Sequence, residues 1–137
     1  MNITVDNSPA TPGRSRSRRV AIIVRSTVQV LLALQVAVGG VLKLTGDAAM
    51  IDLFTDIGWG QWLRLLVGVC ELAGAAGLLI PRLAGLAALA LAGLLAGAVI
   101  TNVTIGANPI APAALGLVAA GLAVSLRHRL PWPAPNR

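Results

Sequence analysis

Four long apolar segments run through the chain, and polar residues gather between them. The segments cover about residues 20–44, 62–80, 83–101 and 112–126. An α-helix needs about 20 apolar residues to cross the hydrocarbon core of a bilayer, so the first three are long enough and the last is short. Because a backbone inside lipid must satisfy its own hydrogen bonds, the pattern predicts helices. We therefore expect an all-α integral membrane protein, a four-helix bundle over residues 20–129.

The flanks of this bundle differ in composition from the apolar segments. Residues 1–19 are rich in serine and arginine and contain prolines, which predicts a disordered cytoplasmic tail. Residues 130–137 contain several prolines and are expected to be irregular.

The polar stretch between the first two segments, residues 45–61, is predicted to be an external loop that contains a short helix. The side chain of Asp47 can cap that helix by accepting a hydrogen bond from a first-turn amide. Its apolar residues recur at helical spacing, which suits a helix lying at the membrane surface. Trp59 and Trp62 are then expected at headgroup level.

Composition supports the membrane assignment and excludes several functions. Apolar residues make up 56% of the 137 residues and charged residues only 12%, about half of the usual share in soluble domains. The single cysteine excludes an intrachain disulfide or a Cys-x-x-Cys redox pair, and the single histidine excludes bis-histidine haem ligation. Asp47, Asp52 and Asp56 lack the spacing of a metal site, so we predict no bound metal.

Positive charge is distributed unevenly, and the distribution predicts the topology. The net charge is +6. Basic side chains flank the apolar segments, which favours cytoplasmic flanks over a nucleic-acid site. The expected cytoplasmic set is Arg14, Arg16, Arg18, Arg19, Arg25, Arg82, Arg127, Arg129 and Arg137, with only Lys43 and Arg64 near the other side. The positive-inside rule then places both termini in the cytoplasm.

The most informative single residue is Glu71, a carboxylate near the middle of an apolar segment. An acid at this depth costs about 2.5–3.5 kcal/mol on insertion scales, so it is a functional candidate by default. At 100° per residue it shares a stripe with Arg64, Gly68, Ala75 and Leu78, and the small residues in this stripe predict contact with another helix. Arg64 lies about 10 Å away along the helix axis.

Lys43, in the first segment, is the other candidate partner of Glu71. We therefore predict a polar cluster of Lys43, Arg64 and Glu71, which is either functional or a structural ion pair. No catalytic residue can be assigned from the sequence.

Secondary polar candidates are Gln29, Gln35 and Asn102. Both glutamines are unfavourable in lipid and are expected to point into the bundle, where bonding to neighbouring helices is their simplest role. Gly39-Gly40 predicts close helix contact, as does the weaker Gly-x-x-x-Gly pair at Gly93 and Gly97. Cys70 is expected to be a small buried apolar residue.

Several of these motifs together resemble the DoxX-like family. They are residues 40–47 (GVLKLTGD), residues 67–74 (VGVCELAG) and residues 78–82 (LLIPR), and the resemblance extends over roughly residues 20–129. It implies a multi-pass, four-helix protein of the bacterial cytoplasmic (inner) membrane, with Lys43 and Glu71 at characteristic positions. Family members often carry a histidine near the end of the third helix, where this chain has Thr101-Asn102.

The resemblance also implies an association with redox chemistry, and three functions remain open. The first is a non-catalytic membrane subunit or scaffold for redox or oxidative-stress enzymes, with a redox enzyme or a second copy as partner. The second is a component of a quinone-linked oxidoreductase, of the thiosulfate:quinone type, in which Glu71 exchanges protons with quinone. The third is a small transporter or proton path, because intramembrane acids often serve that role. No cofactor other than quinone is suggested.

Overall fold

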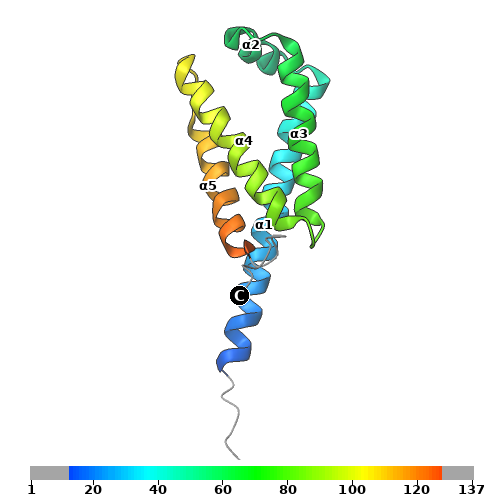
Figure 1. Ribbon diagram of the computed structural model, residues 1–137, viewed down its shortest axis with the longest axis vertical. Helices are drawn as coiled ribbons and strands as arrows, with labels where there is room; N and C mark the ends of the chain where they lie inside the picture. The colour runs from blue at the N-terminus through cyan, green and yellow to red at the C-terminus, as the bar shows by residue number, and fades with distance from the viewer. Residues whose placement is uncertain (1–12, 128–137) are drawn as a thin grey trace, which may run out of the picture.

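A computed structural model describes residues 13–127, and this part of the chain is all-α with no β-strand. Its five helices are α1 (Gly13–Thr45), α2 (Ala48–Ile57), α3 (Gln61–Leu79), α4 (Ala84–Thr104) and α5 (Ile110–Ser125) (Figure 1). The predicted all-α class is confirmed. Residues 1–12 and 128–137, which include most of both predicted tails, lie outside the described residues.

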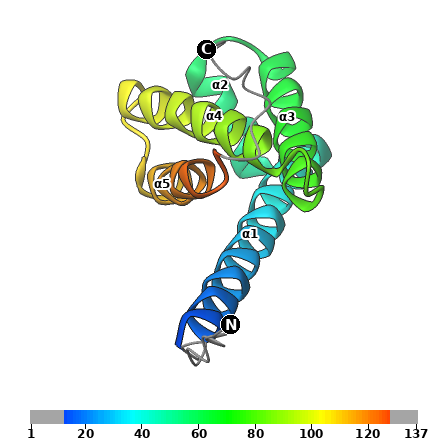
Figure 2. The same ribbon diagram turned by 60° about the horizontal axis from the view of Figure 1, so that its bottom comes forward.

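Three of the helices, α1, α3 and α4, are long and apolar enough to cross a membrane. Helix α5 has 16 residues and is therefore about 24 Å long, somewhat less than the thickness of a hydrocarbon core. These helices support a membrane protein. The four long helices pack as two pairs, α1 with α3 and α4 with α5 (Figure 2). Contacts between α3 and α4 hold the two pairs together.

Helix α1 begins earlier than the sequence predicts. Residues 13–19 are helical, so the expected tail boundary after residue 19 is wrong. Arginine has a high helix propensity, and adding residues to an existing helix costs far less than starting one. The helix of the apolar segment therefore extends into the basic flank. Residues 13–19 contain no proline that would end it.

The short helix predicted between the first two spans is confirmed as α2. The Asp47 side chain accepts a hydrogen bond from the Ala49 amide at 3.1 Å, and Gly58 ends the helix in the left-handed conformation with φ 77°. Phe54 is buried, whereas Trp59 and Trp62, at the junction with α3, are exposed. Exposed tryptophans at a helix junction are typical of the headgroup region.

Small residues control how closely the helices approach. Between α1 and α3, a Cβ added at Gly40 would lie 3.0 Å from the Gly68 carbonyl oxygen, so the two backbones cross in contact. The predicted close contact at Gly39-Gly40 is therefore confirmed. On α4, an added Cβ at Gly93 or Gly97 would meet nothing within 4 Å. The predicted helix contact at that pair is wrong among residues 13–127, because this face of α4 points away from the other helices.

The core lies where the two pairs meet and consists of alanine, leucine and valine. Leu78 and Ala88 are fully buried there, between α3 and α4. The other core side chains are Leu32, Ala33, Val36, Ala75, Ala87, Leu91, Leu95, Ala119, Leu122 and Ala123. Helix α2 and the α4–α5 loop lie at one end of the molecule, which we call the α2 end (Figure 1). The α3–α4 turn and the end of α5 lie at the opposite end.

Candidate polar site between helices α1 and α3

An ion pair joins α1 to α3. Lys43 Nζ donates to Glu71 Oε1 at 3.0 Å and to Oε2 at 2.9 Å. The Lys43 and Glu71 side chains are only 14% and 9% exposed, so both charged groups are largely desolvated. Of the two partners considered for Glu71, the structure selects Lys43.

Helix geometry explains why these two side chains meet. On α3 the buried positions include Arg64, Gly68, Glu71, Ala75 and Leu78, which are the residues of the predicted stripe. Because successive members lie three or four residues apart, they face α1 together. The glycines in the two helices bring the backbones close enough for a direct ion pair without an intervening water.

Gly39 also contributes to the space around this ion pair. A Cβ added there would lie 3.5 Å from Glu71 Oε2 and 3.6 Å from Lys43 Nζ. Those are ordinary van der Waals distances, so the α1 backbone forms one wall of the site.

Arg64 belongs to the same cluster but does not bond to Glu71. Its guanidinium donates from Nη1 to the main-chain oxygen of Lys43 and from Nε to Gln61 Oε1 at 2.7 Å. Arg64 is only 8% exposed. The last carbonyls of a helix have no hydrogen-bond donor within that helix. Arg64 supplies a donor to the Lys43 carbonyl and thereby links α3 to α1.

Gln61 extends the cluster to α2 and is not among the residues predicted from the sequence. Its Nε2 atom donates to the Ile51 carbonyl and to Thr55 Oγ1, both at 3.2 Å. Gln61 stands three residues before Arg64, and side chains at that spacing are neighbours on a helix. That spacing is the signal by which the sequence could have revealed it.

Gln29 is at the opposite end of the same helix pair. It is half-buried, and its Nε2 atom donates to the Leu78 carbonyl in the last turn of α3. The prediction that Gln29 points toward a neighbouring helix is confirmed. It is not part of the Lys43–Glu71 cluster, because it precedes Lys43 by 14 residues, about 21 Å along α1.

Three other sequence predictions have different outcomes. Gln35 is exposed, so the prediction that it points into the bundle is wrong. Cys70 is exposed too, since it lies on the side of α3 that turns away from α1. Asn102 donates to the Asn108 carbonyl at 2.9 Å and ties the α4–α5 loop to the end of α4, apart from the ion pair.

The chemistry of the cluster is that of a closed polar contact. In the described part of the chain, every buried side-chain nitrogen and oxygen has a hydrogen-bond partner. Both carboxylate oxygens of Glu71 accept from the same ammonium group. Within residues 13–127 there is also no group of three or more histidine, cysteine or acidic side chains that could hold a metal ion.

The residues of the ion pair lie within the part of the chain that a family comparison matches. The model of the DoxX-like family matches residues 27–125. The chain belongs to the DoxX-like family. The family match includes Lys43, Arg64 and Glu71 and begins after Arg25. No curated protein and no solved structure matches the chain.

Proposed function

We propose that this DoxX-like protein is a non-catalytic membrane subunit, a scaffold for a redox or oxidative-stress enzyme. The closed Lys43–Glu71 ion pair is the observation that carries the proposal. A general acid or base must reach the proton that it transfers, whereas both oxygens of Glu71 are already engaged with Lys43. The redox association of the partner comes from the family resemblance.

The ion pair suits a scaffold because it defines how α1 and α3 fit together. Any other register of the two helices would separate the pair and leave two uncompensated buried charges, which is costly. A rigid helix pair presents a constant surface to a partner. The exposed apolar side chains on the lipid-facing sides, such as Leu31, Leu34 and Val38, remain available to lipid or to a partner helix.

The proposed location is the cytoplasmic membrane of a bacterium, with both termini in the cytoplasm. The α3–α4 turn, the end of α5 and the first turns of α1 lie away from the α2 end (Figure 1). Arg82 belongs to that turn and Arg127 follows α5, and both are exposed. Reporter fusions test this topology. We expect external reporter activity after Gly60 and after Gly106 and internal activity after Pro81. An internal signal after Gly106 would contradict four spans.

Purification in mild detergent tests the scaffold function. We expect a tagged chain to retain a redox enzyme at constant stoichiometry, and the same enzyme to be lost in Glu71→Leu, whose helix pair is destabilised. A co-purified set indistinguishable from that of an untagged control would reject the proposal.

Glu71→Gln separates the scaffold from a quinone-linked catalyst. The amide keeps the shape of the side chain but cannot accept and release a proton at neutral pH. With a scaffold, quinone-dependent electron transfer by the reconstituted complex stays unchanged for as long as the complex remains assembled. A large loss of transfer in an intact complex would favour the catalytic role, and uncoupled ion flux in liposomes would favour a transporter.

A further inference from the structure

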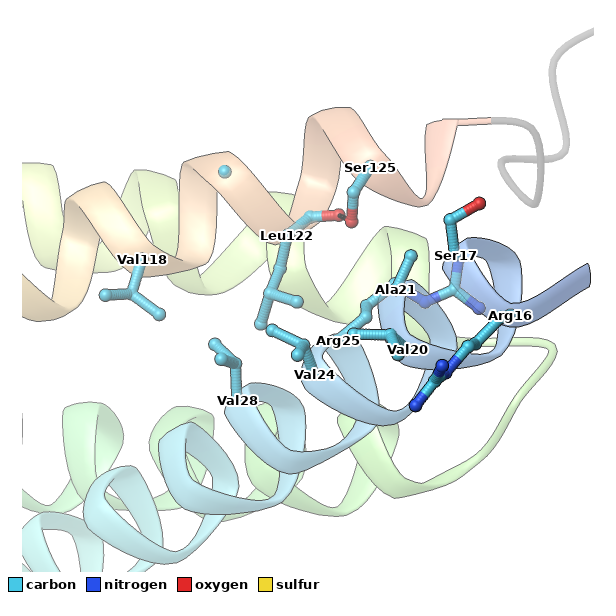
Figure 3. A pocket seen from close by; sticks show the side chains of 11 residues that line it. Arg16, Ser17, Val20, Ala21, Val24, Arg25, Val28, Val118, Leu122 and Ser125 are labelled. Carbon is cyan, nitrogen blue, oxygen red and sulfur yellow. Dashed lines mark hydrogen bonds between the residues drawn. The ribbon is translucent and has the colours of Figure 1, made fainter. Parts of the chain in front are cut away.

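An apolar groove lies between α1 and α5, far from the Lys43–Glu71 pair. Its volume is about 950 Å³. Val24 and Val28 on α1 face Val118 and Leu122 on α5 across the gap (Figure 3). The remaining lining residues are Arg16, Ser17, Val20, Ala21, Arg25, Gly121 and Ser125. The walls are therefore hydrocarbon, and the charged residues of the lining all belong to the first part of α1.

Two arginines give the groove a charge that the structure leaves uncompensated. Arg16 is exposed and Arg25 is half-buried. The salt bridge found in the described residues joins Lys43 to Glu71, so no acidic side chain in that part of the chain neutralises Arg16 or Arg25. A guanidinium binds a phosphate through two parallel hydrogen bonds, which makes a phosphodiester a suitable partner.

The position of Arg25 along α1 matches the boundary between headgroups and hydrocarbon. Arg25 and Lys43 are 18 residues apart, so they are about 27 Å apart along the helix, close to the thickness of a hydrocarbon core. With Lys43 near one boundary, Arg25 lies near the other and Arg16 is among the headgroups. Beyond Arg25 the groove continues into the hydrocarbon between Val28 on α1 and Val118 on α5 (Figure 3).

We propose that this groove binds one anionic phospholipid, its phosphodiester on Arg16 and Arg25 and an acyl chain against the valines of α1 and the surface of α5. Basic pockets between membrane helices on the cytoplasmic side are suited to anionic headgroups. The family match begins after both arginines, so the charged part of the site lies outside the matched residues, whereas the α5 wall lies within them. It does not depend on the scaffold proposal.

Lipid titration of the full, delipidated chain in detergent, followed by native mass spectrometry, tests the site. Phosphatidylglycerol and phosphatidylcholine with identical acyl chains are the two probes. One arginine near an anionic headgroup raises affinity roughly fivefold, so two arginines give an expected preference of about twenty-five-fold for phosphatidylglycerol, saturating at one lipid per chain. Arg16→Gln/Arg25→Gln should abolish this preference.

Two matched controls separate a defined site from general attraction. Arg18→Gln/Arg19→Gln removes the same charge from the same exposed region of α1, but neither residue lines the groove, and the preference should persist. Gly121 lines the groove, and a Cβ added there meets nothing within 4 Å, so the side chain of Gly121→Leu begins in open space and should weaken binding of both lipids by occupying the groove. Gly97→Leu makes the same change at an equally open helical position outside the groove and should not.

The opposite results would overturn the proposal. They are equal affinity for the two lipids, equal losses in the two arginine pairs, or unchanged binding in Gly121→Leu. Displacement of the lipid by excess inorganic phosphate would show an anion site without the acyl contribution. A dimer that dissociates in Gly121→Leu would show that a second copy of the chain occupies the groove.

Discussion

Charged and polar side chains join helices α1 and α3, whereas helices α4 and α5 pack through alanine and leucine. The first pair has the Lys43–Glu71 ion pair, the Arg64 bond to the Lys43 carbonyl and the Gln29 bond to the Leu78 carbonyl of α3. In the second pair, Leu95 and Ala119 are buried, and no side-chain hydrogen bond between α4 and α5 occurs in the described part of the chain. The two pairs therefore differ in the kind of contact that holds their helices together.

This difference teaches how each pair depends on its surroundings. Lipid tails are as apolar as leucine, so burying leucine between helices in a bilayer gains little beyond van der Waals packing. The α4–α5 pair can therefore slide by small steps at low cost. In the α1–α3 pair a slide would break an ion pair in a region of low dielectric constant, which is costly. We therefore expect the first pair to resist a change of register more strongly than the second.

Removing Glu71 gives the largest expected effect on this contrast. Glu71→Leu leaves Lys43 buried without its counter-ion and should lower the free energy of unfolding by about 3 kcal/mol. Denaturation of the protein in micelles by sodium dodecyl sulfate, followed by circular dichroism, measures it. Lys43→Met/Glu71→Leu should lose much less than the sum of the single variants, because neither charge remains. Strict additivity would show that the two side chains are not coupled.

Glycine substitutions test the close approach of α1 and α3. Gly40→Ala places a Cβ 3.0 Å from the Gly68 carbonyl oxygen, whereas Gly97→Ala on α4 meets nothing within 4 Å. Both changes gain the same helix propensity, so their difference in unfolding free energy isolates packing. We expect Gly40→Ala to be less stable than Gly97→Ala by about 1–3 kcal/mol. Equal stabilities would mean that the helix crossing is loose.

The two glutamines of α1 provide a smaller, matched test. Gln29→Leu removes the donor to the Leu78 carbonyl and should cost about 1 kcal/mol of stability. Gln35→Leu changes an exposed amide, so its effect should stay within about 0.5 kcal/mol. The same detergent titration compares them. A larger loss at Gln35 would point to a polar contact made with another molecule.

The most local expected effect concerns α2, which Gln61 links to the first pair. Asp47→Ala removes the cap on the Ala49 amide and should destabilise α2 locally by about 1 kcal/mol. Hydrogen exchange should then accelerate in α2 and leave the α4–α5 pair unchanged. Asp52→Ala, at an exposed position on the same helix, is the control. Faster exchange throughout the chain would instead mean that α2 unfolds together with the rest.

Particular residues show how far sequence reasoning extends. The buried stripe on α3 follows from helical spacing alone, and so does the cap at Asp47. Gln35 is different, because its hydrophilic character suggested the interior while its helical phase did not. Leu32 and Val36 are buried one turn apart, and Gln35 is 100° away from Val36. Helical phase, and not the polarity of the side chain, decides which way it points.

The glycine pairs show the other limit. Gly40 and Gly93 carry the same small-residue signal, yet only Gly40 lies in a helix contact. A small-residue motif predicts that another helix can pack closely against it, but it does not predict which helix that is. Likewise, the choice between Lys43 and Arg64 as partner of Glu71 needed the relative position of two helices that are far apart in the sequence.

Apolar length, charge asymmetry and the resemblance of short motifs were sufficient to assign an all-α membrane protein of the DoxX-like family and to single out Glu71. These features are local, because hydropathy and helical phase act over one or two turns of chain. Only the tertiary structure decided that Lys43 pairs with Glu71 and that the Arg64 side chain binds the main-chain oxygen of Lys43 near the end of α1. It also decided that α1 and α5 leave between them a groove whose lining includes two arginines. Those outcomes depend on the crossing of helices, which arises from packing between segments distant in sequence.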